Sequence, residues 1–127
     1  MIFLDKDRLF EKIDELENYL RELEEYLPEG EDEYLNKGLI KRACERAFQL
    51  AGENLLDICN LIISEKGFGI PSDSKDSISK LAENGVIPGS LSTRLEELVG
   101  FRKLKDFYEF IETIDKYIEL ETGKPHE

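Results

Sequence analysis

A chain of 127 residues has the size of one domain with a single hydrophobic core. Apolar residues make up 40% of it, charged residues 36%, and proline occurs only four times, a mixture that favours helices and excludes a disordered chain. The net charge of −12 disfavours a protein that coats nucleic acid, because such a surface carries a basic excess.

The negative charge is concentrated at the start of the sequence. Residues 1–33 hold 13 acidic and 4 basic residues, a balance of −9 within the total of −12. The rest of the chain is therefore nearly neutral, and a local cationic site that contacts RNA stays compatible with the composition.

Three features point to a cytoplasmic protein that does not associate with membranes. No apolar run is long enough to cross a bilayer, and Asp5 comes too early for a signal peptide. Cys44 and Cys59 lie 15 residues apart in one predicted helix, about 22 Å along its axis, which is too far for a disulfide. We therefore expect both cysteines to be reduced core residues.

Two long helices are predicted in the first half of the chain. In the first, which ends at residues 28–30, apolar residues alternate at spacings of four and three: Leu9, Ile13, Leu16, Leu20, Leu23 and Leu27. The second runs from about Asp32 to Lys66 and is apolar over much of its circumference. It is therefore expected at the centre of the domain, with neighbours on several sides.

Shorter helices are predicted after the turn at residues 67–71. Residues 72–74 are expected to cap a helix that runs to about Glu83. The next helix follows the turn at residues 86–90, with Ser90 or Thr93 as its N-cap.

The last predicted helix carries the apolar residues Leu104, Phe107, Ile111, Ile114 and Ile118, and residues 122–125 end it. The sequence thus predicts one all-α domain over residues 1–127, an up-and-down bundle of four to five helices.

A row of polar residues follows the central helix at intervals of four. It consists of Glu45, Gln49, Glu53 and Asp57, with Arg46 beside them. On a helix packed on several sides, some of these side chains would be buried or would line a cleft. An exposed row with ion pairs is the alternative. We keep the row as candidate cleft-lining or supporting residues.

The sequence does not indicate metal or cofactor chemistry. Its only histidine, His126, lies beyond the last predicted helix, which excludes a histidine-based triad or a histidine-rich metal site within the fold. Gly67 and Gly69 follow a helix and lack a third glycine, so they mark a helix exit and not a phosphate loop. We expect no cofactor and no bound metal.

Several short motifs follow one another along the chain. They are Glu45-Arg46, Leu55-Leu56-Asp57-Ile58, Leu81-Ala82-Glu83, Gly85-Val86-Ile87-Pro88 and Gly100-Phe101-Arg102, with residues 102–118 as a closing helix. Together they resemble the HepT-like members of the HEPN family, which are small all-helical proteins encoded beside a minimal nucleotidyltransferase. The resemblance covers nearly the whole chain.

This resemblance implies the toxin of a toxin–antitoxin pair, a homodimer that cleaves RNA without metal. In the family, the active site lies between two protomers and contains an arginine followed closely by His-x-Tyr. The nucleotidyltransferase is the antitoxin, and it adds AMP to that tyrosine. Arg102, directly after Gly100-Phe101, takes the position of the catalytic arginine.

The sequence departs from the family directly after Arg102. Residues 103–108 contain no histidine, and Leu104 to Phe107 already match the closing helix, so the His-x-Tyr segment is missing at the join of Arg102 and Lys103. The intact flanks favour a native protein that has this segment, although a shortened family member is the alternative. The first case requires a Cα–Cα gap at the join well beyond about 3.8 Å.

Three functions follow for the chain. It is a ribonuclease toxin, a non-catalytic helical dimer that binds a nucleotidyltransferase, or a bundle in which Arg102 only forms an ion pair at a helix end. The acidic first helix is a possible docking surface in the second case.

Overall fold

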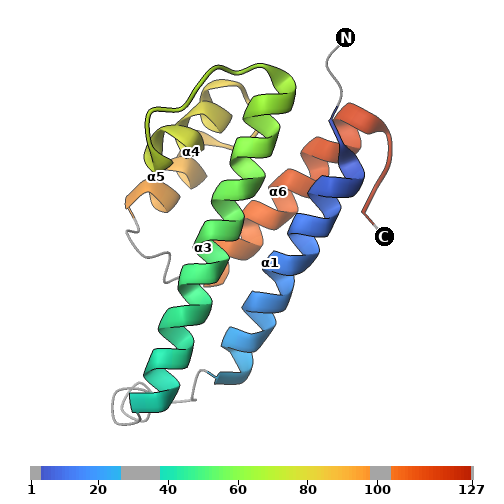
Figure 1. Ribbon diagram of the computed structural model, residues 1–127. Helices are drawn as coiled ribbons and strands as arrows, with labels where there is room; N and C mark the ends of the chain where they lie inside the picture. Colours follow the sequence, from blue (N-terminus) through green and yellow to red (C-terminus); the bar gives the residue numbers. More distant parts are fainter. Residues whose placement is uncertain (1–3, 27–37, 98–103, 127) are drawn as a thin grey trace.

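The computed structural model describes residues 4–26, 38–97 and 104–126, and these residues form helices and no strand (Figure 1). The helices are α1 (Lys6–Tyr26), α3 (Gly38–Lys66), α4 (Ser74–Glu83), α5 (Gly89–Glu97) and α6 (Leu104–Thr122). α1 runs antiparallel to α3 and α6. The short helix α4 packs against the C-terminal half of α3, and α5 packs against α4 and α6. The predicted all-α bundle is confirmed.

α1 buries the apolar face that its sequence predicts. The predicted apolar residues that the structure describes are completely buried: Leu9, Ile13, Leu16, Leu20 and Leu23. The sixth, Leu27, lies outside the described residues. The backbone N–H of Asp5 donates to Glu65 Oε2 at 2.9 Å, and Asp5 Oδ1 accepts from the N–H of Arg8 at 3.2 Å. These contacts cap the start of α1 and attach it to the end of α3.

α3 is the central helix, as predicted. It packs against α1 along its length and against α4, and its buried residues include Ala51, Leu55, Ile58 and Ile62. Cys44 and Cys59 are both buried and form no disulfide with each other, so their predicted position in the core is confirmed. Burial raises the pKa of the Cys59 thiol, so this thiol is unreactive at neutral pH.

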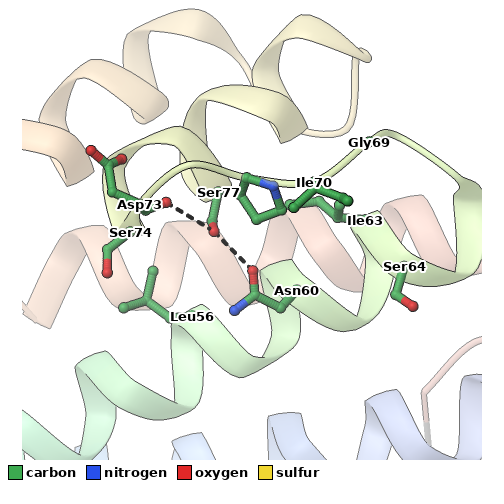
Figure 2. Close-up of a pocket in the computed structure, with 10 residues that line it drawn as sticks. Leu56, Asn60, Ile63, Ser64, Gly69, Ile70, Asp73, Ser74 and Ser77 are labelled. Atoms are coloured by element: carbon green, nitrogen blue, oxygen red, sulfur yellow. Dashed lines mark hydrogen bonds between the residues drawn. The ribbon is translucent and has the colours of Figure 1, made fainter.

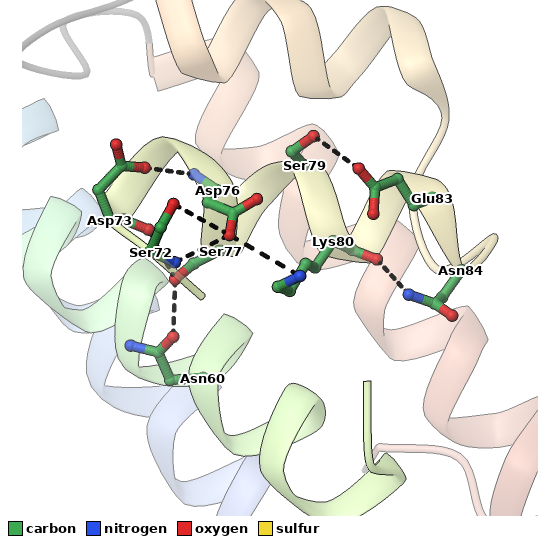
Figure 3. Close-up of polar contacts among 9 residues, drawn as sticks. All are labelled: Asn60, Ser72, Asp73, Asp76, Ser77, Ser79, Lys80, Glu83 and Asn84. Carbon is green, nitrogen blue, oxygen red and sulfur yellow. Dashed lines mark hydrogen bonds and ion pairs between the residues drawn. The ribbon is translucent and has the colours of Figure 1, made fainter. Parts of the chain in front are cut away.

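The N-cap predicted from the sequence is confirmed for α4 but not for α5. Asp73 is the N-cap of α4, and its side chain accepts from the N–H of Asp76 at 2.8 Å (Figure 3). The prediction of Ser90 or Thr93 as N-cap of α5 was wrong, because the helix begins at Gly89. The carbonyl of Pro88 accepts the first helical hydrogen bond, from Ser92 N–H at 3.1 Å.

Some predicted features lie outside the described residues. They are the turn at 28–30, the start of the second helix at 32–37, and the join of Arg102 and Lys103 with its expected chain gap. Among the helices that the structure describes, none is long and apolar enough to span a bilayer.

Candidate functional site

Arg102 lies outside the described residues, but the helices on both sides of it are joined by a cluster of charges. Arg94 of α5 donates from Nη1 to Asp106 Oδ1 of α6 at 2.7 Å, and its Nη2 contacts Glu109 Oε2. Its Nε donates to the carbonyl of Ser90 at 3.3 Å. α5 is therefore attached to the start of α6, and in the sequence residues 98–103, which include Arg102, connect these two helices.

Asp106 is the buried member of this cluster. Only 3% of the residue is exposed, and a buried carboxylate requires a cation and hydrogen bonds to offset its lost hydration. Its second oxygen, Oδ2, is buried and accepts no hydrogen bond from the described part of the chain. The pKa of Arg94 is raised, chiefly by its hydrogen bond with Glu109.

Neither Arg94 nor Asp106 belongs to the site residues predicted from the sequence. A signal was present at Asp106, because this charged residue immediately precedes the buried Phe107 and lies one helical turn before Phe110. A charged residue on the apolar face of a helix indicates a buried ion pair. The identity of its partner could not be inferred without the packing of α5 against α6.

The predicted polar row on α3 faces solvent. Glu45, Arg46, Gln49, Glu53 and Asp57 are all exposed. The structure brings three of them together, since Arg46 donates to Gln49 Oε1 at 3.3 Å and Gln49 to Glu53 Oε1 at 3.4 Å. Within one chain they form an exposed row, and a role in a cleft between two chains stays a prediction.

Asp57 differs from the rest of the row because it reaches α1. Its carboxylate lies 3.8 Å from Lys12 Nζ, and it lines a shallow pocket of about 320 Å³ together with Arg8, Lys12 and Asn60. The buried polar residue of α3 is instead Asn54, whose Nδ2 donates to Glu15 Oε2 at 2.9 Å. Sequence periodicity did not distinguish Asn54 from its exposed neighbours.

A larger pocket of about 570 Å³ lies between α3 and the segment that leads into α4 (Figure 2). Its walls combine apolar groups such as Leu56 and Pro71 with the polar residues Asn60 and Ser77. Ser77 Oγ donates to Asn60 Oδ1 at 2.8 Å, so these two polar groups already satisfy one another. None of the predicted site residues that the structure describes lines this pocket.

The sequence model of the family described as Ribonuclease HepT-like matches residues 16–105, which is more than half of the chain. The chain belongs to the HepT-like ribonuclease family. The matched range begins in α1, contains α3, α4 and α5 completely, and extends past Arg102 to the start of α6. The resemblance identified in the sequence is confirmed.

Known proteins similar to this HepT-like chain include the mRNA nuclease HepT of Shewanella oneidensis. The two are 35% identical over 65 residues, which is 51% of this chain and 43% of that protein. The aligned part therefore spans less than half the length of this relative.

Solved structures agree with the family fold over more of the chain. A structure of the toxin–antitoxin MntA–HpeT superposes with a TM-score of 0.79 at 25% identity, covering 87% of this chain and 98% of the other. YutE of Bacillus subtilis, a cytosolic protein of unknown function, superposes with a TM-score of 0.81 at 19% identity over 98% of this chain and 97% of its own. The second comparison extends the shared fold to nearly the whole HepT-like chain.

Proposed function

We propose that this chain is the toxin subunit of a toxin–antitoxin pair whose second member is a nucleotidyltransferase. The observation that carries the proposal is the family match, which continues to residue 105 and so includes Arg102 with the helices before it. The superposition on the toxin–antitoxin MntA–HpeT supports the same assignment. The working form is a cytoplasmic homodimer.

The proposed reaction is metal-independent cleavage of RNA at the interface of the dimer. Arg102 contacts a phosphate and stabilises the negative charge that develops when an RNA 2′-hydroxyl attacks the adjacent phosphorus. The ion pair of Arg94 with Asp106 supports this role, because it holds the helices on both sides of Arg102. Proton transfer, which the family assigns to a histidine, requires the segment that is missing after Arg102.

A non-catalytic role in the same pair is the second candidate, and the position of His126 favours it. The chain after α6 folds back, so that His126 Nδ1 lies 3.4 Å from Asp115 Oδ1, and Asp115 is about 16 Å along the axis of α6 from Leu104. The only histidine of the chain is therefore far from the start of α6, which Arg102 precedes by two residues. In this role the bundle dimerises and binds the nucleotidyltransferase without cleaving RNA.

An RNA cleavage assay in the presence of EDTA separates the two candidates. A ribonuclease cleaves RNA under these conditions, and Arg102→Ala is expected to lower the rate by about 10²–10³-fold, as when one charge-stabilising donor is removed. Lys75→Ala removes an exposed cation of α4 outside the candidate site and should leave the rate unchanged. Intact RNA after incubation with the wild-type protein contradicts the ribonuclease.

The binding role has its own test. The chain must co-purify with the nucleotidyltransferase. If the contact lies on the acidic face of α1, replacing its exposed residues Glu22, Glu24 and Glu25 by Gln should abolish the complex. The matched control replaces Glu112 and Glu119, two exposed carboxylates of α6. An intact mass that exceeds 14.7 kDa by some tens of residues, and that no tag explains, would indicate that the His-x-Tyr segment is present in the native protein.

A further inference from the structure

The chain after α6 folds back over the bundle and places His126 between α1 and α6. The imidazole stacks on Phe10 of α1, with ring centroids 4.4 Å apart and an interplanar angle of 4°. Only 16% of the His126 side chain is exposed, so the imidazole is largely buried against the bundle. This stacking directs the two ring nitrogens toward different carboxylates.

Nε2 of His126 faces α1 and Nδ1 faces α6. Nε2 lies 2.9 Å from Asp14 Oδ1, and Nδ1 lies 3.4 Å from Asp115 Oδ1. Glu17 follows Asp14 by three residues on α1 and therefore shares its face. One donor atom each of Asp14, Glu17 and His126 lies within 4.8 Å of the others.

Asp115 occupies the position of a supporting residue. Its Oδ1 is shielded from solvent and, at 3.4 Å from Nδ1, forms an ion pair that is not aligned as a hydrogen bond. A histidine that binds a metal through one nitrogen usually donates its other N–H to such a carboxylate, which fixes the tautomer. Asp115 could therefore orient the imidazole of His126 toward an ion held by Asp14 and Glu17.

The charges at this position are unbalanced. Asp14 and Asp115 lie against the two ring nitrogens of His126, and a carboxylate oxygen of Glu17 lies within 4.8 Å of the donor atoms of Asp14 and His126. Three carboxylates therefore share a single imidazole, which carries at most one positive charge. A divalent cation would offset the remaining negative charge.

We propose that Asp14, Glu17 and His126 bind one zinc ion, with His126 coordinating through Nε2 and donating Nδ1–H to Asp115. Imidazole nitrogen and carboxylate oxygen are ordinary zinc ligands, and water completes the coordination. Binding displaces the proton from Nε2 and replaces the ion pair with Asp14. The ion would attach the C-terminal segment to α1 and α6, and this structural role does not depend on RNA cleavage.

Zinc titration by isothermal calorimetry tests the proposal on protein purified without a histidine tag. One zinc ion per chain is expected, with loss of binding in His126→Ala and about 10–100-fold weaker binding in Asp115→Asn. Glu22→Gln is the control, because it removes an exposed α1 carboxylate outside the site and should bind zinc like the wild type. Zinc should also raise the Tm of the wild type and not that of His126→Ala.

Two results would overturn the proposal. One is the absence of binding heat, and the other is equal zinc binding by the wild type and His126→Ala, which would assign the ion to the acidic surface in general. A measurement on the wild type alone avoids any dependence on the folding of a variant. Because His126 is the only histidine, its imidazole nitrogen resonances are unambiguous, and unchanged resonances after addition of zinc would exclude coordination.

Discussion

Tyr108 connects α6 to α1 through its hydroxyl, which donates to Glu24 Oε1 at 2.6 Å. The contact joins residues 84 positions apart, and 38% of Tyr108 is exposed. The pKa of Tyr108 is raised to about 12, mainly by partial burial and to a smaller extent by the hydrogen bond to Glu24. Both effects favour the neutral phenol, which keeps its proton more tightly in the folded chain than in the unfolded one.

This pKa shift predicts a loss of stability at high pH. Between pH 10 and about 12, the folded state keeps a proton that the unfolded state has released, so the free energy of unfolding falls as pH rises. Below pH 10 the contribution of Tyr108 is fully present. Tyr108→Phe should show a smaller decline over this range in denaturant titrations.

Tyrosinate absorbance provides the direct measurement. Subtracting the titration of Tyr108→Phe from that of the wild type should leave one tyrosine with a midpoint near 12. A difference curve centred at pH 10 would show that the contact with Glu24 does not exist in solution.

At the scale of single elements, α4 depends on side-chain hydrogen bonds because it has only 10 residues. Asp73 caps its first turn, Asp76 accepts from the N–H of Ser72 at 2.8 Å, and Asn84 Nδ2 donates to the carbonyl of Lys80 at 2.8 Å (Figure 3). Ser77 attaches the helix to Asn60 of α3. Each end of α4 thus has side-chain partners for its backbone groups or for the adjoining turn.

Loss of the N-cap should destabilise the protein measurably. Asp73→Ala leaves the N–H of Asp76 without its acceptor, and the expected cost is about 1 kcal/mol of unfolding free energy. Asp73→Ser should recover most of it, because a serine hydroxyl also accepts at this position. Urea denaturation measures the difference, and Ser74→Ala, at the neighbouring exposed residue, is the control. Equal stability of Asp73→Ala and Ser74→Ala would contradict the capping role.

At the scale of the whole molecule, α3 holds the bundle together. Leu55 in its middle is completely buried, whereas Leu39 near its start is 81% exposed. Leu55→Ala should therefore cost about 2–5 kcal/mol of unfolding free energy, since it leaves a cavity in the core. Leu39→Ala makes the same chemical change, and its effect should stay within about 0.5 kcal/mol. Similar midpoints for both variants in denaturant would show that α3 is not central.

The helices were predictable because each one has an apolar period long enough to read from the sequence alone. The spacing of Leu9 to Leu23 predicted α1, and the broad apolar circumference of α3 predicted its central place. The Asp73 cap was predictable from the residue type alone. The start of α5 was not, because Ser90 and Thr93 are both favoured N-cap residues, whereas the first helical hydrogen bond is accepted by the carbonyl of Pro88. Family membership also followed from the order of motifs between Glu45 and Arg102.

The sequence by itself determined the helices, their apolar faces and the family, since these depend on neighbours within a few turns of the chain. Only the tertiary structure decided which polar groups meet. The contacts of Arg94 with Asp106, Tyr108 with Glu24, and His126 with Asp14 join residues from different helices or from the C-terminal segment. Helical periodicity places a side chain on a face, but its partner depends on how two helices pack and where the chain after α6 turns back.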